Sequence, residues 1–484
     1  MRPEAVLAID QGTSSTKALL VSANRVVLSR AEVPLHPVAL GRGWVEQDPA
    51  ELWDSVCRAG QIALAGADAE VQGVGVANQG ETVLAWNRRT TQPTGNALTW
   101  QDRRATDVCH RLNAYAEELR QLTGLPLDPY FAAPKMAWLA DSLSPGYVAS
   151  MCDSWLLTKL TGEYATDAAS ASRTLLLDLD TGQWSDRACE IFGIDPSTLP
   201  SVIDCAGPIA ETSTFGAPLP VTGAVVDQQA ALLAENCIQP GETKCTYGTG
   251  AFLLVAMGST RPHPRSGLVG SIACRLKGKI SYCLDGQVYT AGSLVGWLQA
   301  IGLITGPSDL DRLSTGHTRN DGPVFVPSLA GLAAPLWQPR ARGVITGVNL
   351  STTAADLVTA ALDGLAASIA WLAHAAAADL GKPIERLRVD GGLTQSVSLM
   401  QMQADLLQVP VEVYPSEEAT AYGAAALAWL GAGRTEEAQL TISDWKPEMV
   451  YEPTIGADEA QSRLARWRRV AALAAELDSS EGLP

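Results

Sequence analysis

Two short apolar runs near the amino terminus enclose a small polar loop. Val6–Ile9 and Ala18–Val21 are typical of buried strands, and the glycine and hydroxyl residues between them predict a tight hairpin turn. A carboxylate such as Asp10, followed at once by glycine and hydroxyls, can hold a divalent cation while the loop faces phosphate oxygens. The alternative interpretation is an ordinary hairpin turn rich in serine and threonine.

Further apolar runs predict strands that end in polar residues. Val71–Val76 ends in the polar segment Ala77–Thr82, and polar groups at the carboxyl end of a buried strand are where α/β proteins bind ligands. A simple exit loop fits that segment equally well. Short strands are also expected at 83–86 and 97–100, the second ending in Trp100 and Gln101-Asp102-Arg103-Arg104. This cluster suits either the gripping of a hydroxylated substrate or a solvated helix start.

The strand predicted at Val221–Val226 ends in Asp227-Gln228-Gln229, and a helical pattern begins at Ala230. A carboxylate at such a junction could accept a proton from a substrate hydroxyl. The alternative is that Asp227 only caps the helix.

A second glycine-threonine turn follows about half a chain after the first. Thr246-Tyr247-Gly248-Thr249-Gly250 leads into the apolar run Ala251–Met257. Two such hairpins suggest a duplicated domain in which each half offers one phosphate loop to a shared cleft. A later strand, Leu387–Val389, precedes Asp390-Gly391-Gly392, and the glycine pair would admit a nucleotide against bare backbone.

Helical periodicity predicts three main helices. One covers about 50–65 after the Asp48–Pro49 start signal, and a long one begins at Thr353 and ends before Gly381. An alanine-rich helix near 418–425 is interpreted as a packing surface. The last 25 residues or so are charged and helical and end in a loose tail from Ser479.

Composition and charge narrow the class of protein. The length of 484 residues predicts two or three domains, and a net charge of −17 argues against nucleic acid or an anionic membrane as a partner. Nine cysteines without a C-x-x-C pair suggest neither disulfides nor zinc, so we expect a reducing cytoplasm. No signal peptide, uninterrupted run of ~18 apolar residues, P-loop or Rossmann motif is found. We therefore expect a soluble cytoplasmic enzyme.

With these motifs in view, the chain resembles the FGGY family of carbohydrate kinases, and within it the glycerol kinases, from about residue 3 to 455. The most specific stretches are Asp10–Ser15, Asn78–Thr82, Trp100–Arg104, Asp128–Phe131, Gly223–Ala231, Thr246–Phe252, Phe325–Gly347, Arg388–Gly392 and Glu418–Ala425.

The resemblance implies an α/β protein with two duplicated actin/hexokinase-like (ribonuclease H-like) domains around a central cleft. Residues 1–240 would carry the substrate site and the first hairpin, 241–455 the second hairpin and the nucleotide site, and 456–484 a helix and tail. The implied activity is ATP-dependent phosphorylation of a terminal hydroxyl of a small polyol or ketose. A catalytically silent relative that binds sugar or nucleotide is the alternative, and a homodimer is possible.

The resemblance also implies the roles of individual residues. Asp227 would be the general base, and Asp10 would carry Mg²⁺. The acceptor would be bound by Gly80, Glu81, Trp100, Tyr130, Asp227, Gln228 and Phe252. ATP would be held by Thr13, Ser14, Ser15, Lys17, Thr249, Gly292, Gly296, Gly392 and Ser396.

Three positions depart from the pattern of glycerol kinases. The arginine expected between Gln79 and Glu81 is Gly80, so we expect glycerol to be at best a weak substrate and a four- or five-carbon acceptor to be preferred. The competing interpretation is a true glycerol kinase in which another cation, such as Arg103, takes its place. Lys17 replaces an arginine and Gly296 a glutamine on the nucleotide side. The inhibitor-binding loop for a sugar bisphosphate has no counterpart in 214–220, so that control is expected to be absent.

Overall fold

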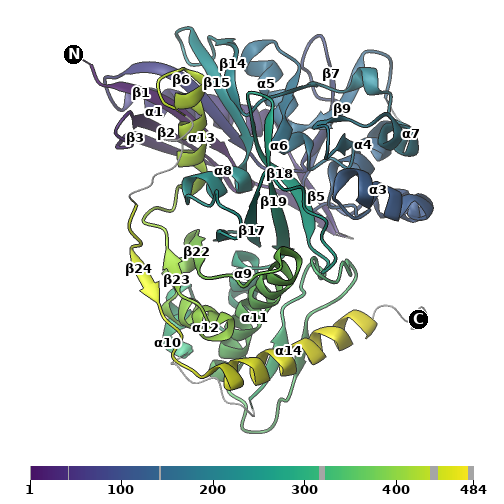
Figure 1. The fold of residues 1–484 in the computed structure, drawn as a ribbon, viewed down its shortest axis with the longest axis vertical. Coiled ribbons are helices and arrows are strands. Elements are labelled where there is room, and N and C mark those ends of the chain that lie inside the picture. Colours follow the sequence, from purple (N-terminus) through teal and green to yellow (C-terminus); the bar gives the residue numbers. More distant parts are fainter. Residues whose placement is uncertain (1, 42, 141–142, 315–321, 437–444, 478–484) are drawn as a thin grey trace.

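The computed structural model describes residues 2–41, 43–140, 143–314, 322–436 and 445–477, and every structural statement below concerns these residues. Two halves, each built around a twisted sheet, lie one above the other in Figure 1. The first part of the chain forms the upper half, and most of the second part forms the lower half. The predicted tail from Ser479 lies outside the described residues.

The sheet of the N-terminal half has the strand order β14-β15-β6-β1-β2-β3. β1 and β2 form the predicted antiparallel hairpin, and β1, β6 and β15 run parallel. The six strands are β1 (Glu4–Gln11), β2 (Ser15–Ser22), β3 (Val27–Pro34), β6 (Glu70–Asn78), β14 (Ala206–Thr212) and β15 (Leu219–Val226).

The sheet of the C-terminal half has the order β18-β19-β17-β16-β22-β23-β24. Its strands are β16 (Thr243–Tyr247), β17 (Ala251–Gly258), β18 (Val269–Leu276), β19 (Lys279–Val288), β22 (Leu387–Asp390), β23 (Val411–Val413) and β24 (Met449–Tyr451). β16 pairs antiparallel with β17 and parallel with β22, as β1 pairs with β2 and β6. The strand order β3-β2-β1-β6-β15 of the first sheet therefore recurs in the second sheet as β19-β17-β16-β22-β23. This repeated order confirms the predicted duplication.

Smaller sheets and helices complete the two halves. A five-stranded sheet contains β4 (Val38–Gly41), β5 (Trp44–Gln47), β7 (Val83–Asn87), β8 (Ala97–Leu98) and β9 (Tyr147–Met151). Two-stranded sheets are formed by β10 (Ala165–Asp167) with β13 (Ser201–Ile203), β11 (Leu177–Asp178) with β12 (Gln183–Trp184), and β20 (Val324–Val326) with β21 (Val344–Thr346). The strand expected at 97–100 ends two residues early, at Leu98. The chain turns at Thr99, whose carbonyl accepts a hydrogen bond from Asp102 N–H.

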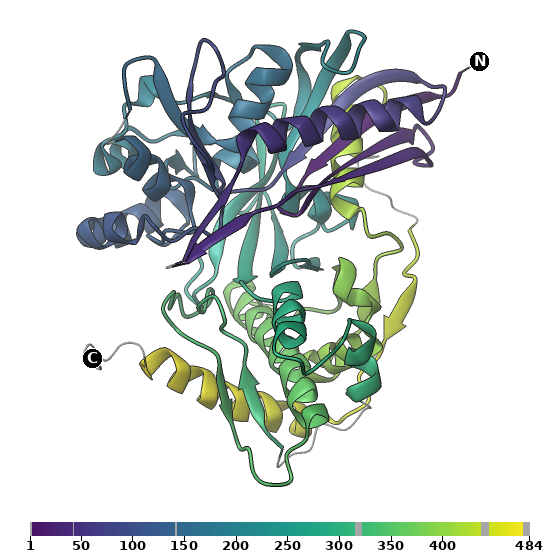
Figure 2. The ribbon, with the colours of Figure 1, turned by 180° about the vertical axis from the view of Figure 1, so that it is seen from behind.

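The helices are α1 (Pro49–Ala65), α2 (Thr106–Arg111), α3 (Ala116–Thr123), α4 (Ala132–Ala140), α5 (Cys152–Thr161), α6 (Ala168–Ala171), α7 (Asp186–Phe192), α8 (Asp227–Ala234), α9 (Gly292–Ala300), α10 (Ser308–Leu313), α11 (Ala354–Leu380), α12 (Val397–Leu407), α13 (Ala419–Gly431) and α14 (Ala457–Leu477). Figure 2 shows α1 crossing the outer face of the N-terminal sheet. Its predicted start is confirmed, because the Asp48 carboxylate accepts a hydrogen bond from Ala50 N–H and Pro49 is the first helical residue.

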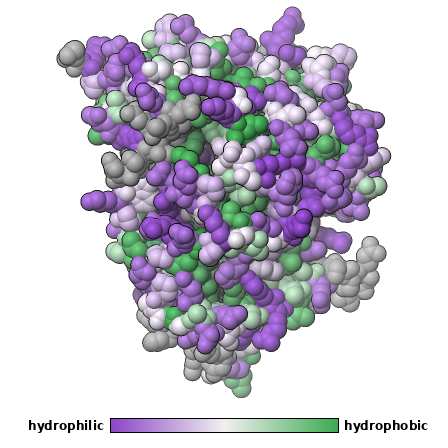
Figure 3. All heavy atoms as spheres, in the orientation of Figure 1, coloured by the Kyte–Doolittle hydropathy of each residue, from purple (hydrophilic) through white to green (hydrophobic). Residues whose placement is uncertain are grey.

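The long helix α11 forms the centre of the lower half. A capping box joins Thr353 and Asp356 at its start, and Gly381 in the left-handed conformation ends it, as predicted. Among the described helices it is the one that is long and apolar enough to cross a membrane, but 72% of its most apolar window is buried inside the protein. That burial is typical of a core helix. On the face drawn in Figure 3, hydrophilic residues predominate and apolar residues form separate patches.

Helix α13 returns from the C-terminal part of the chain to pack on the N-terminal sheet, against β1, β6 and β15 and beside α8 (Figure 1). Glycines allow this close approach. A Cβ atom on Gly75 would lie 2.2 Å from the carbonyl oxygen of Ala424, and one on Gly423 would lie 2.0 Å from that of Ala230. The predicted packing surface is confirmed, and it ties residues of the 241–455 segment to the first sheet.

We predict that Gly423→Ala destabilises the protein, with Gly296→Ala as the matched control. Both glycines are helical, so alanine gains roughly 1 kcal/mol of helix propensity at each. Only at Gly423 does the methyl group clash with backbone, because nothing lies within 4 Å of a Cβ on Gly296. Overpacking of this kind costs about 1–3 kcal/mol or more. In thermal unfolding, a Gly423→Ala variant as stable as Gly296→Ala would contradict the packing account.

Candidate active site

A cavity of about 220 Å³ lies between the two glycine-threonine hairpins and takes its walls from both halves of the chain. Its walls include thirteen of the residues predicted from the sequence: Asp10, Thr13, Ser14, Ser15, Lys17, Gly80, Glu81, Trp100, Tyr130, Asp227, Gln228, Thr249 and Phe252. A larger surface groove beside β13 and β14 lies away from all of them. Segments that are far apart in the sequence are therefore brought to one place, while the ligand contacts themselves stay predictions.

Four predicted nucleotide residues lie outside the walls of this cavity. Gly292 begins α9 beside the second hairpin, where its N–H donates to the carbonyl of Gly248. Open space surrounds the Cβ positions of Gly296 and Gly392. The Ser396 hydroxyl caps α12 and donates to Asp311 Oδ1 at 2.8 Å, so it is already engaged within the protein.

The first hairpin is linked directly to the wall predicted for the acceptor. Trp100 Nε1 donates to the Thr13 hydroxyl at 2.9 Å, and Thr13 donates to Gln79 Oε1 at 3.1 Å. Gln79 in turn donates to Gln47 Oε1 at 2.8 Å. The resemblance implies that Thr13 binds ATP. In the structure its hydroxyl joins the hairpin to Trp100, and this bond fixes the relative position of the two walls.

Asp227 lies at the junction of β15 and α8. It is the first helical residue rather than a cap, which corrects the predicted helix start at Ala230, and its Oδ1 accepts a hydrogen bond from Gln228 N–H at 2.7 Å. Burial, followed by repulsion from Glu81, raises the pKa of Asp227 to about 7. A pKa near 7 suits a general base, because the group is then largely ionised at neutral pH and still basic enough to accept a proton.

Asp10 lies at the end of β1, opposite Lys17 in the register of the hairpin. Burial and repulsion from Asp227 raise the pKa of Asp10 to about 7, against the lowering effect of Lys17. No hydrogen bond to its carboxylate is present among the described residues. A carboxylate without such a bond in a cavity wall fits a divalent cation, for which hard oxygen ligands are preferred.

A buried lysine fixes the orientation of Gln228. Lys244 on β16 is fully buried, and its Nζ donates to Gln228 Oε1 and to the Thr246 hydroxyl, each at 2.7 Å. Because the carbonyl of Gln228 is held by Lys244, its Nε2 group is left for the cavity. Gln228 is thus poised to donate to an acceptor oxygen next to Asp227.

An arginine missed from the sequence lies in the wall predicted for the acceptor. Arg173 is 3% exposed and contacts Glu81 Oε1 at 2.6 Å and Asp285 Oδ2 at 2.8 Å. Glu81 has φ 54°, a left-handed conformation that is strained for a side chain of this size. No apolar periodicity or motif in residues 169–183 marks Arg173 in the sequence.

Three aromatic rings form the apolar part of the cavity. The Trp100 ring lies edge-on to Phe252 at 5.7 Å and to Tyr130 at 6.1 Å between centroids. Lys135 holds the backbone at Tyr130 in place, because its buried Nζ donates to the carbonyls of Pro129 and Tyr130. Such rings suit the C–H faces of a polyol, while the carboxylates and amide suit its hydroxyls.

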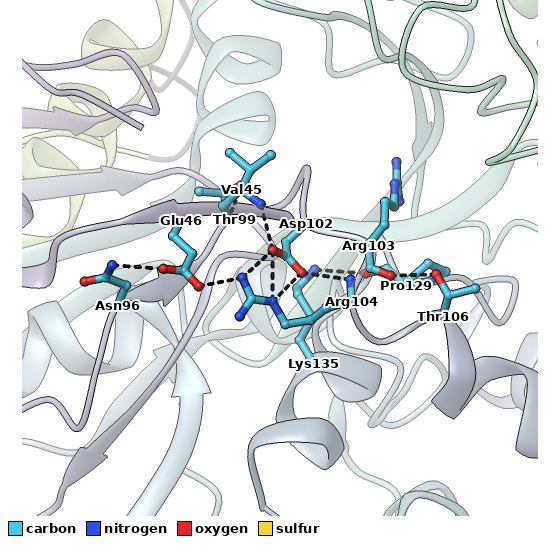
Figure 4. Close-up of polar contacts among 10 residues, drawn as sticks. All are labelled: Val45, Glu46, Asn96, Thr99, Asp102, Arg103, Arg104, Thr106, Pro129 and Lys135. Atoms are coloured by element: carbon cyan, nitrogen blue, oxygen red, sulfur yellow. Dashed lines mark hydrogen bonds and ion pairs between the residues drawn. The ribbon is translucent and has the colours of Figure 1, made fainter. Parts of the chain in front are cut away.

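Trp100 lines the cavity, whereas the charged side chains that follow it are engaged with one another and with nearby residues (Figure 4). Asp102 is fully buried and accepts hydrogen bonds from Val45 N–H and from Arg104, which also pairs with Glu46 at 2.6 Å. Arg103 pairs with Asp128 at 3.1 Å. These groups are neither solvated nor among the residues lining the cavity, so they brace the turn that carries Trp100.

Duplicated sheets, one glycine-threonine hairpin from each, and a carboxylate between them define a two-domain kinase of the actin/hexokinase-like class. The family model "FGGY family of carbohydrate kinases" matches in its N-terminal domain over residues 5–234 and in its C-terminal domain over 243–432. The chain belongs to the FGGY family of carbohydrate kinases, and it is an ATP-dependent kinase.

Individual relatives agree with this assignment. The chain is 39% identical to a glycerol kinase of Burkholderia pseudomallei, with 97% of each chain covered, and 36% identical to one of Acinetobacter baylyi, with 96% and 97% covered. Among solved structures, Plasmodium falciparum glycerol kinase with ADP matches with a TM-score of 0.87 at 29% identity, covering 98% of each chain. A xylulose kinase from Rhodospirillum rubrum matches with 0.82 at 25%, covering 98% and 99%.

We predict that Asp227→Asn abolishes turnover and leaves nucleotide binding nearly unchanged. General-base assistance is worth ~10² to 10⁴ in rate, and a base that also orients the hydroxyl lies at the upper end. Steady-state kinetics and calorimetric titration with ADP measure the two effects separately. A variant that keeps more than about a tenth of wild-type kcat would remove Asp227 from this role.

We also predict that kcat/KM for the acceptor falls about tenfold per pH unit on the acidic side of pH 7, at saturating nucleotide. The raised pKa of Asp227 means that protonation removes the base there. Lys244 lowers that pKa, so Lys244→Met should move the acidic limb to higher pH. A profile that stays flat down to pH 5.5 in the wild type would show that no such group controls catalysis.

Proposed function

We propose that this kinase transfers the terminal phosphoryl group of ATP to a terminal hydroxyl of a small polyol or ketose. The observation that carries the proposal is the Asp227 carboxylate, with its raised pKa, in the wall of a cavity that has a glycine-threonine hairpin on either side. The catalytically silent alternative is disfavoured because Asp10, Asp227 and both hairpins are present.

In the proposed mechanism, the acceptor lies against the three rings with its reacting hydroxyl at Asp227. Asp227 accepts the proton of that hydroxyl as the oxygen attacks phosphorus, and Gln228 Nε2 holds a neighbouring oxygen of the acceptor. Lys17 and the backbone of the first hairpin face the phosphates, and Thr249 faces them from the second half. Because the walls come from both halves, we propose that the halves close on the ligands and exclude water.

We propose Mg²⁺ as the divalent cation, with Asp10 as the residue that holds it. The support is the position of this carboxylate in the cavity wall and the repulsion from neighbouring carboxylates that raises its pKa, which a cation would relieve. A bound divalent cation would neutralise negative charge on the phosphates during transfer. Among the described residues, no cluster of three or more ligating side chains forms a metal site, so the phosphates would complete the coordination.

Gly80 bears on the identity of the acceptor. It lies in the cavity wall and, as a glycine, offers no guanidinium to the acceptor. The other candidate cation, Arg103, already pairs with Asp128 and lies over the ring of Tyr289, 4.4 Å from its centroid. We therefore propose a four- or five-carbon polyol or ketose as the preferred acceptor. The names of the curated relatives favour the competing candidate, glycerol.

We predict that the wild type prefers erythritol, threitol, ribulose or xylulose to glycerol, and that Gly80→Arg shifts the ratio of kcat/KM toward glycerol. One charge-assisted hydrogen bond is worth roughly 10- to 150-fold in affinity. Gly80→Ala is the matched control, because a Cβ here would lie 3.0 Å from Val226 Cγ2 and the alanine variant isolates that crowding. A wild type that prefers glycerol to all the longer acceptors would support the glycerol candidate instead.

We propose a cytoplasmic location. All nine cysteines are free, and eight of them are buried, which suits a reducing compartment. The homodimer stays a prediction.

A further inference from the structure

Asp285 belongs to β19 of the C-terminal half, yet it pairs with Arg173 of the N-terminal half. Arg173 contacts Asp285 Oδ2 through Nη1 at 2.8 Å and Glu81 Oε1 through Nε at 2.6 Å. Its Nη1 also donates to the Ser271 hydroxyl at 2.7 Å. The guanidinium therefore joins the two halves at the wall of the cavity and fixes the position of the Asp285 carboxylate.

The second oxygen of that carboxylate has no partner. Asp285 is 3% exposed, lines the cavity, and its Oδ1 makes no hydrogen bond with any described residue. Burial raises the pKa of Asp285, and the nearby amide of Gln287, on the same face of β19, opposes that rise without reaching hydrogen-bond geometry. A buried acceptor without a donor is costly, so the cavity is the natural source of one.

The carboxylates form a series that begins at the first hairpin. Repulsion from Asp227 acts on Asp10, repulsion from Glu81 acts on Asp227, and repulsion from Asp285 acts on Glu81. All three of Asp227, Glu81 and Asp285 line the cavity, and Arg173 contacts both Glu81 and Asp285. An acceptor that reacts at Asp227 and extends past Glu81 would therefore reach Asp285.

The charges along this path favour an uncharged acceptor. Three carboxylates face one guanidinium, and the nearby Lys135 is bound to backbone carbonyls, with its pKa lowered to about 7 by burial. A carboxylate on the acceptor would meet net negative charge there.

We propose that Asp285 is an acceptor-binding residue whose Oδ1 receives a hydrogen bond from the distal hydroxyl of an uncharged polyol or ketose of four or more carbons. The inference rests on the proposed function, because it takes Asp227 as the base that fixes the reacting end. Arg173 is then a positioning residue that aims the carboxylate.

The test compares Asp285→Ala with Asp285→Asn, which keeps an acceptor oxygen, on glycerol, erythritol and erythronate. We expect Asp285→Ala to lose about tenfold or more in kcat/KM for erythritol, mainly through KM, and less than about threefold for glycerol. Asp285→Asn should lose less. Wild type should favour erythritol over erythronate, its carboxylate counterpart, by about tenfold or more.

Equal losses on glycerol and erythritol would show that Asp285 is only structural, and no loss on either would show that it does not contact the acceptor. If thermal melting shows that Asp285→Ala is unfolded, the Asp285→Asn variant and the wild-type comparison of erythritol with erythronate still test the inference. Equal wild-type rates on erythritol and erythronate would overturn it. Failure of the wild type to phosphorylate any neutral acceptor would instead overturn the proposed function.

Discussion

The structure depends on holding several acidic side chains together where its two halves meet. Asp10 and Asp227 repel each other in the wall of one cavity, and Asp390 and Glu418 add to the repulsion on Asp10. Folding gains nothing from such a cluster, because burial and like charge both disfavour the ionised forms. Lys244, buried beneath them, offsets part of the repulsion. The cost is understandable if a cation and a nucleotide occupy this place during the reaction.

Contacts elsewhere in the fold hold the individual walls of the cavity in place. The sheet of each half delivers one hairpin to the cavity, and α13 packs on the first sheet through glycines that leave no room for a side chain. Hydrogen bonds from Trp100 to Thr13 and from Thr13 to Gln79 fix the acceptor wall to the first hairpin. Polar groups that look like substrate ligands in the sequence, such as Asp102 and Arg104, are used to brace these walls instead.

Local patterns were sufficient for much of the fold and for part of the site. Apolar runs and start signals placed the two hairpins, α1 and α11, and the repeated glycine-threonine turn indicated the duplication. Arg173 and Asp285 could not be found this way, because they meet only when the turn after α6 and strand β19, from different halves of the chain, are brought together. The predicted start of α8 was also wrong. Its first turn, Asp227-Gln228-Gln229, is polar because it faces the cavity, so it lacks the apolar periodicity that marks the rest of the helix.

The most direct test of the account is the pH dependence of the stability of the ligand-free protein, compared between the wild type and Asp10→Asn. The pKa of Asp10 is raised from 3.8 to about 7 in the folded protein, so ionising it costs stability as pH rises through that range. The account predicts that Asp10→Asn gains stability relative to the wild type between pH 5 and 8 in thermal unfolding. A difference that is independent of pH, or a variant that is less stable at pH 8, would contradict it.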